Sequence, residues 1–141
     1  MVRQERAVRT RAKLLAAAAI EFDACGYLST TIDDVAERAQ VTRGSAYYHF
    51  TSKAELASRL ATEQYARWGT FVDERRDAGF RGIELVMLLA HDLAISFRDD
   101  VASRAAIRLI KERAHIEADL PTPFDGWIAV VRQLLVEARE L

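Results

Sequence analysis

The sequence predicts an all-α protein. Alanine, leucine, arginine and glutamate are abundant, only two prolines occur, and alternating apolar and polar runs are almost absent. These residue types favour helices, and the apolar positions recur at the helical period instead of the period of two that strands require. Half of the 141 residues are hydrophobic. The chain can therefore build a core without metal ions or disulfides.

The first helix is expected over residues 8–25. Leu15, Ala18 and Phe22 recur at steps of three and four residues, which places an apolar stripe on one face of the helix. Gly26 follows at the position where a residue with positive φ commonly ends a helix. We therefore expect the chain to change direction at this glycine.

Two short helices are expected next, separated by a very short turn. Thr31 and Asp34 form an acidic variant of the capping box at the start of the first one. Thr42 is a suitable N-cap for the second one, over residues 43–49. Helices joined by a turn as short as Gln40-Val41 cannot lie antiparallel and must cross steeply. The sequence therefore predicts a helix-turn-helix.

The rest of the chain is expected to form a helical body. Ser52 and Glu55 give the S-x-x-E capping box of a long helix, which ends at the break over residues 77–82. Residues 82–98 are apolar on nearly every side, so we expect other helices to surround this helix. Asp99-Asp100 can cap the next helix, which is expected to end near residue 115.

The end of the chain and its single cysteine add three expectations. A last helix should begin near Phe124, because the two prolines of the loop before it cannot continue a helix. Cys25 cannot form an internal disulfide and is expected to be a small buried hydrophobe. One free thiol, no leader segment and no apolar run near the length of a membrane span, about 18 residues, predict a cytoplasmic protein.

Positive charge is concentrated at the N-terminus. Residues 1–13 contain five basic side chains and one acidic side chain, whereas the whole chain has a net charge of −1. A basic arm ahead of a near-neutral body is suited to binding phosphates. A solvated, frayed terminus is an equally good interpretation of the charge alone.

A dense set of positions between residues 31 and 56 matches a known pattern. These positions are Thr31, Val35-Ala36, Val41-Thr42, Gly44, Tyr47, His49-Phe50, Lys53 and Leu56. The pattern resembles the N-terminal DNA-binding domain of TetR-family transcriptional regulators. The resemblance implies a three-helix DNA-binding domain over residues 1–52, followed by a ligand-binding and dimerisation body over residues 53–141. The chain ends where the body of that family continues, so this body is expected to be incomplete.

Further positions narrow the resemblance. They are residues 6–11, Phe22-Asp23, Gly26-Tyr27, residues 29–31 and the proline-aromatic-tryptophan run over residues 121–127. Within the TetR family they resemble the γ-butyrolactone autoregulator receptors of actinomycetes. The resemblance implies a homodimer that binds a palindromic operator, usually as a repressor, and is released by a small, mainly apolar effector such as a γ-butyrolactone. It implies no cofactor, no metal and no enzyme activity.

Two residues depart from the family pattern. Gln40 stands where the family has glycine, so Gln40 is expected to adopt a left-handed conformation at some energetic cost. Ala46 replaces a larger aliphatic residue, which should thin the packing behind the recognition helix.

The start of the recognition helix is the predicted base-reading element. Arg43 can form a bidentate pair with guanine O6 and N7, because a recognition helix presents its N-terminal residues to base edges. Gly44 lets the helix backbone approach the DNA closely, and Ser45 can reach a base or a phosphate.

The other predicted DNA contacts follow from the resemblance. Tyr47 and His49 are expected to donate to phosphate oxygens, and Tyr48 to contact the backbone or a thymine methyl. Lys53 is expected to bind a phosphate beside the free N–H groups of its helix. Thr31 and Thr42 place two further helix starts near the DNA. On composition alone, such an aromatic run is more often divided between core and surface; Phe50 is expected in the core.

The body is expected to hold the effector. Its candidate ligand-binding residues are Met87, Leu88, Phe97, Ile110, Phe124 and Trp127. Ordinary core is an equally good interpretation for all of them except Trp127, whose indole combines a flat apolar wall with one donor. The three histidines have no metal-ligand spacing, and no catalytic motif occurs. The alternative function is a helical interaction module or a pseudo-receptor that has lost DNA or ligand binding.

Overall fold

The structure, a computed structural model, describes residues 2–139 apart from the side chains of Arg3, Pro123 and Phe124. Its regular secondary structure within this range is entirely helical, which confirms the predicted class. Within residues 2–139 the structure has no helix that could serve as a membrane span. The elements are α1 (Val2–Ser29), α2 (Ile32–Arg38), α3 (Arg43–His49), α4 (Lys53–Asp77), α5 (Gly82–Asp99), α6 (Val101–Lys111), a 3₁₀ turn (Arg113–His115) and α7 (Pro123–Arg139).

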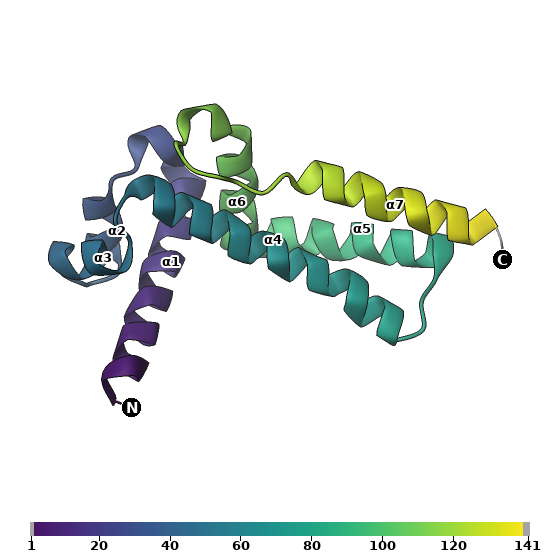
Figure 1. Cartoon of the computed structure of the whole chain (residues 1–141), viewed down its shortest axis with the longest axis horizontal. Helices are drawn as coiled ribbons and strands as arrows, with labels where there is room; N and C mark the ends of the chain where they lie inside the picture. Colours follow the sequence, from purple (N-terminus) through teal and green to yellow (C-terminus); the bar gives the residue numbers. More distant parts are fainter. Residues whose placement is uncertain (1, 140–141) are drawn as a thin grey trace.

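The molecule is elongated, and different helices form its two ends (Figure 1). Helices α1, α2 and α3 form one end, which we call the N-terminal unit. Helix α4 leads from this unit along the molecule, and α5 and α7 lie beside each other at the other end, which we call the distal end. Helix α6 lies between the two ends and packs against both α1 and α4.

The helix-turn-helix forms as predicted, and its caps explain why. The hydroxyl of Thr31 accepts from the backbone N–H of Asp34 at 3.1 Å, and the Asp34 carboxylate accepts from the N–H of Thr31 at 2.9 Å. The hydroxyl of Thr42 accepts from the N–H of Ser45 at 3.1 Å. Gln40 has φ of 55°, so the left-handed turn expected at this position is confirmed.

A continuous core joins the N-terminal unit to the middle of the molecule. Phe22 of α1, Val35 of α2, Leu56 of α4 and Leu109 of α6 are all fully buried in it. Ala46 of α3 is also buried. Because α4 and α6 supply part of this core, residues on both sides of position 52 are packed together. The domain division at that position remains a prediction.

The first helix is longer than the sequence pattern predicted. Helix α1 begins at Val2 instead of residue 8 and is interrupted at Gly26, whose φ of 78° and ψ of 177° are not helical. A side chain at Gly26 would meet Arg108 Nη2 at 2.7 Å and Glu112 Oε1 at 2.8 Å. The positive φ expected there is confirmed.

The prediction of a buried thiol is wrong, because Cys25 is exposed. Helix α6 covers a different face of α1 and leaves the face of Cys25 in solvent.

Two predictions about the later helices are corrected. Helix α5 is not surrounded: Leu85 and Leu89 are buried, but Met87 is 68% exposed. The reason is that α4, α6 and α7 approach α5 from part of its circumference only. The start of α4 has half of a capping box. Ser52 accepts from the N–H of Glu55 at 3.0 Å, but the Glu55 carboxylate accepts from the N–H of Thr51 at 2.7 Å.

Other boundaries agree with the expectations. Helix α4 ends at Asp77, and Asp100 caps α6 by accepting from the N–H of Ala102 at 3.0 Å. Helix α6 itself ends at Lys111, and the 3₁₀ turn extends to the expected position at His115. Helix α7 starts at Pro123, one residue before the predicted start.

Candidate nucleic-acid interface and ligand cleft

The first turn of α3 is exposed and free to approach another molecule. Nothing lies within 4 Å of the position that a side chain at Gly44 would occupy. Arg43 is exposed, with its guanidinium 3.3 Å from Asp33 Oδ2 and 5.5 Å from the centre of the Tyr47 ring. An exposed ion pair of this kind contributes only about 0–1 kcal/mol. Arg43 can therefore exchange Asp33 for a stronger partner at little cost.

The aromatic run divides between surface and core. Tyr48 is 79% exposed and Tyr47 is 40% exposed, whereas Phe50 is buried, as expected. His49 is half-buried, and its ring stands edge-on to that of Tyr48 with centres 5.2 Å apart. The face of α3 opposite the core thus presents two phenols and an imidazole, which are groups that bind phosphate oxygens.

Lys53 is engaged within the protein. Its ammonium donates to the backbone carbonyl of Tyr27 at 2.7 Å and lies 4.3 Å from the centre of the Tyr27 ring. These contacts tie the start of α4 to the end of α1. A phosphate bound by Lys53, which remains a prediction, would have to share the ammonium with Tyr27 or displace it.

Thr31 and Thr42 act first as caps. Both hydroxyls accept backbone hydrogen bonds, at the starts of α2 and α3 respectively. Ser45 is half-buried beside Thr42. These interactions fix the orientation of the two helices, and they leave the predicted DNA contacts of Thr31, Thr42 and Ser45 to be tested.

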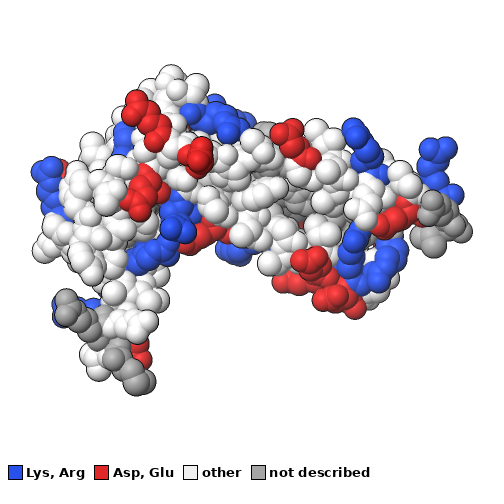
Figure 2. All heavy atoms as spheres, viewed as in Figure 1, with Lys and Arg blue, Asp and Glu red and all other residues white. Residues whose placement is uncertain are grey.

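Charge alone does not mark a single binding face. In the view of Figure 2, basic and acidic side chains are interspersed over both ends of the molecule. On the face seen in this view, no broad patch of one charge marks an interface. Among the described residues, no cluster of His, Cys, Asp and Glu could hold a metal ion.

A narrow cleft of about 220 Å³ lies between α4 and α7. It is largely apolar, and Trp68 and Trp127 stand among its walls. Sequence reasoning missed Tyr65, whose hydroxyl occupies the space that a side chain at Gly126 would need. The glycine directly before Trp127 was the available signal, because an interior glycine in a helix often marks a close approach. The lining residues are Tyr65, Ala66, Trp68, Gly69, Val72, Gly126, Trp127 and Val130.

Of the five predicted ligand-binding residues whose side chains are described, only Trp127 lines this cleft. Ile110 is buried and Met87 is mostly exposed. Leu88 and Phe97 are half-buried, with the Phe97 ring edge-on to Trp68 at 5.7 Å. The side chain of Phe124 lies outside the described residues.

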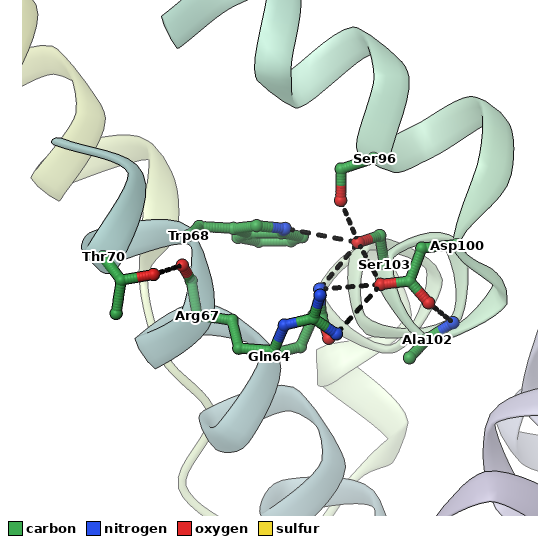
Figure 3. Close-up of polar contacts among 8 residues, drawn as sticks. All are labelled: Gln64, Arg67, Trp68, Thr70, Ser96, Asp100, Ala102 and Ser103. Carbon is green, nitrogen blue, oxygen red and sulfur yellow. Dashed lines mark hydrogen bonds and ion pairs between the residues drawn. The ribbon is translucent and has the colours of Figure 1, made fainter. Parts of the chain in front are cut away.

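A polar cluster lies behind the cleft, where α4, α5 and α6 meet (Figure 3). The hydroxyl of Ser103 accepts from Gln64 Nε2 at 2.7 Å and from the indole N–H of Trp68 at 3.3 Å. It donates to Asp100 Oδ2 at 3.1 Å and also contacts the hydroxyl of Ser96. Trp68 therefore connects the wall of the cleft with the first turn of α6.

The far end of α6 is bound to the end of α1. Arg108 Nη1 donates to the carbonyl of Asp23 at 2.7 Å, and Glu112 Oε2 accepts from the N–H of Tyr27 at 2.7 Å. Burial acts to raise the pKa of Glu112, but the hydrogen bonds from Tyr27 and Arg108 outweigh it and lower the pKa. Burial, with a smaller contribution from the charge of Glu117, raises the pKa of Tyr27.

Comparison with known proteins supports the division into a helix-turn-helix at the N-terminus and a helical body. The sequence profile of the family described as "Bacterial regulatory proteins, tetR family" matches residues 14–60. The A-factor receptor protein of Streptomyces griseus is 30% identical over 145 residues, which cover 99% of this chain and 48% of that protein. The regulator TtgR of Pseudomonas putida is 48% identical over 62 residues, which cover 43% of this chain and 30% of that protein. The chain thus spans about half of the A-factor receptor, and less of TtgR.

Solved structures agree over most of the chain. A structure from work on the control of antibiotic production by bacterial hormones has 42% identity and a TM-score of 0.84, and the match covers 94% of this chain and 70% of that one. A γ-butyrolactone receptor described as ArpA-like has 32% identity and a TM-score of 0.86, with coverage of 94% and 69%. CprB of Streptomyces coelicolor, in complex with its operator, has 32% identity and a TM-score of 0.83, with coverage of 94% and 66%.

Proposed function

This chain belongs to the TetR family of bacterial regulatory proteins, and we propose that it is a transcriptional regulator, acting as a repressor, that binds a palindromic operator as a homodimer. A small, mainly apolar effector such as a γ-butyrolactone releases it. In this proposal the protein works on DNA in the cytoplasm and catalyses no reaction.

One observation carries the DNA-binding proposal. The first turn of α3 is capped by Thr42 and exposes Arg43 beside an unobstructed Gly44. A recognition helix contacts base edges with its N-terminal residues, and arginine pairs with guanine through two hydrogen bonds. In this arrangement Arg43 reads a base while Tyr47, Tyr48 and His49 contact the flanking backbone.

The dimer proposal is supported by symmetry and by similarity. A palindromic operator mirrors a two-fold protein dimer, with half-sites about 34 Å apart or a multiple of that distance. CprB, which has a similar structure, was solved with its operator sequence.

The effector proposal depends on the cleft between α4 and α7. Its volume of about 220 Å³ lies below the usual range of about 300–1,000 Å³ for ligand pockets, which favours a small molecule. Tyr65 and Trp127 bring a hydroxyl and an indole to a lining that is otherwise mainly apolar. A compact ligand with an apolar chain and one or two acceptor oxygens, such as a γ-butyrolactone, fits this chemistry.

Selection of binding sites from random DNA tests the DNA-binding function. We expect enrichment of a palindrome that the protein binds with strong salt dependence, because phosphate contacts release counterions. If no sequence is enriched and no salt-dependent affinity is found, the protein is a helical interaction module instead.

Substitution of Trp127 tests the effector site. Trp127→Ala should abolish release from the operator by a γ-butyrolactone while changing operator affinity by no more than about threefold, since α7 lies far from α3 (Figure 1). Phe71→Ala is a suitable control. Like Trp127, Phe71 is half-buried against the core formed by Leu85, Leu89 and Leu134, but it does not line the cleft. A collapse of operator binding in Trp127→Ala would show that Trp127 is structural.

A further inference from the structure

A groove runs along the N-terminal turns of α1, beside the turn that connects α2 and α3. Its volume is about 490 Å³, and its lining is predominantly polar. Arg6, Arg9 and Lys13 line its α1 side, and Gln40-Val41 line the opposite side. We call it the α1 groove.

The cations of the α1 groove form one strip on the surface of α1. Arg6, Arg9 and Lys13 are separated by three and four residues, which places them on one face of a helix. All three are exposed. Among the described side chains, the ion pairs of the N-terminal unit involve Arg11, Arg38 and Arg43 instead. The positive charge of Arg6, Arg9 and Lys13 is therefore not neutralised by ion pairs within the described part of the N-terminal unit.

The groove lies next to the proposed recognition helix. Gln40-Val41 form one wall and lead directly to the cap of α3 at Thr42. The N-terminal turns of α1 extend past α2 and α3, away from the distal end (Figure 1). When α3 enters a major groove of DNA, Arg6, Arg9 and Lys13 are therefore beside the DNA strand that borders this groove.

We propose that the α1 groove binds the phosphodiester backbone of DNA immediately outside the base pairs read by α3, through Arg6, Arg9 and Lys13. Residues 6 to 13 extend over about 10 Å of helix, which corresponds to roughly three base-pair steps of about 3.4 Å. Arginine binds phosphate through two parallel hydrogen bonds and lysine binds it as a point charge. The contact would add affinity without sequence preference. It rests on the proposed DNA-binding function.

The test compares two operator duplexes. One carries about ten base pairs of flanking DNA on each side of the selected palindrome, and the other ends at the palindrome. The triple variant Arg6→Gln, Arg9→Gln, Lys13→Gln should lose at least about tenfold affinity on the long duplex at physiological salt and lower its salt slope by about 2–3 units per protomer. On the short duplex its affinity should stay within about twofold of the unmodified protein.

The control removes the same charge elsewhere. Lys111→Gln, Arg113→Gln, Arg67→Gln neutralises one lysine and two arginines that are exposed outside α1, α3 and the apolar face of α7, and it should not distinguish the two duplexes. A second variant, Glu5→Gln, removes the negative charge of the groove. It should strengthen binding to the long duplex by about two- to threefold, a gain that misfolding cannot produce.

The outcomes separate this inference from the proposed function. Failure of the unmodified protein to bind either duplex contradicts DNA binding itself. Normal binding by the unmodified protein, with an equal loss on both duplexes in the triple variant, places the three cations inside the half-site and overturns the inference. An unchanged affinity and salt slope on the long duplex also overturns it, as does an equal loss in the control triple.

Discussion

The two ends of the molecule use apolar residues in opposite ways. In the N-terminal unit the apolar faces of the helices are covered, and Phe22 and Val35 share one core with Leu56 of α4 and Leu109 of α6. At the distal end the fully buried side chains are Leu85, Leu89 and Leu134. Large aliphatic residues there remain on the surface. These are Ile83, Met87, Ile128, Leu135 and Val136.

The exposed groups of the two ends also differ in chemistry. The N-terminal unit exposes arginines and phenols beside a capped helix, and these groups recognise a charged, hydrogen-bonding partner such as DNA. The distal end exposes an apolar face, which is what a large obligate interface is built from. The difference indicates that the apolar faces of the N-terminal unit are already covered by α4 and α6, whereas the distal end is suited to burial in the proposed dimer.

The largest contrast should come from two glycines of the N-terminal unit. Gly26→Ala should lower the free energy of unfolding by about 3 kcal/mol, because alanine is strained at this backbone conformation and its Cβ would meet Arg108 and Glu112. Gly44→Ala should raise it by about 0.5–1 kcal/mol, because alanine favours helix and the site is open. Urea denaturation measures both. Equal changes in the free energy of unfolding for the two variants would contradict the close contact of Gly26 with Arg108 and Glu112 of α6.

The next contrast concerns leucine and methionine in α5. Leu89→Ala should cost about 2–4 kcal/mol, since it removes a buried side chain and leaves a cavity. Met87→Ala, on the exposed face two residues away, should change the stability by less than about 0.5 kcal/mol. The same denaturation measurement should be made at low protein concentration, so that association does not protect the face. Comparable losses would mean that the face of Met87 is covered.

A smaller effect is expected at the polar cluster between the two ends. Ser103→Ala should cost about 2 kcal/mol, because it removes the acceptor of the buried Trp68 indole N–H and the nearer of the two acceptors of the Gln64 amide. Ser29→Ala, at an exposed position, is the matched control and should change the stability by less than about 0.5 kcal/mol. Thermal unfolding followed by circular dichroism is sufficient. An equal stability of the two variants would argue against the cluster in Figure 3.

The smallest effect is a pH dependence contributed by two carboxylates. At the end of α6, where it contacts α1, burial opposes but does not cancel the hydrogen bonds that lower the pKa of Glu112. At the distal end, Arg75 donates hydrogen bonds that lower the pKa of Asp92. Because both folded pKa values lie below the unfolded ones, each group stabilises the fold above its unfolded pKa. This stabilisation is lost as the pH falls through the folded pKa.

Two variants separate the contributions. Glu112→Gln and Asp92→Asn should each reduce the stability near neutral pH and flatten its decline on acidification, so that each variant approaches the unmodified protein once the pH is below the folded pKa of the replaced group. Urea denaturation at a series of pH values measures the difference. A stability difference that is independent of pH would show that the lost contribution is packing and not charge.

The N-terminal unit was the more predictable of the two ends. Its caps at Thr31 and Thr42 are local features, so spacing along the sequence was sufficient to place them. The left-handed turn at Gln40 was expected from the resemblance to the TetR family, which has glycine at this position. The start of α1 was not predicted, because residues 2–7 carry little apolar periodicity. The exposure of Cys25 depends on which side α6 approaches from, which no local pattern encodes.

The distal end shows what apolar periodicity leaves open. The apolar residues of 82–98 predicted a surrounded helix, but periodicity describes a helix and not its neighbours, and Met87 lies in solvent. For the cleft, the indole of Trp127 was predicted from its chemistry. Tyr65 could not be, since it lies some sixty residues away in the sequence and is positioned by the packing of α4 against Gly126.

Binding of Arg43→Ala to a panel of single-base operator variants tests the central claim that α3 reads base pairs. The variant should lose about 1–3 kcal/mol per half-site on the selected operator and lose its preference at one position of each half-site. Its salt dependence should stay close to that of the unmodified protein. Tyr47→Phe, which removes one neutral donor and keeps the ring, should weaken all sequences slightly and alike. If Arg43→Ala lowers affinity equally on every variant of the panel, Arg43 contacts a phosphate and the assignment of base reading to this residue is wrong.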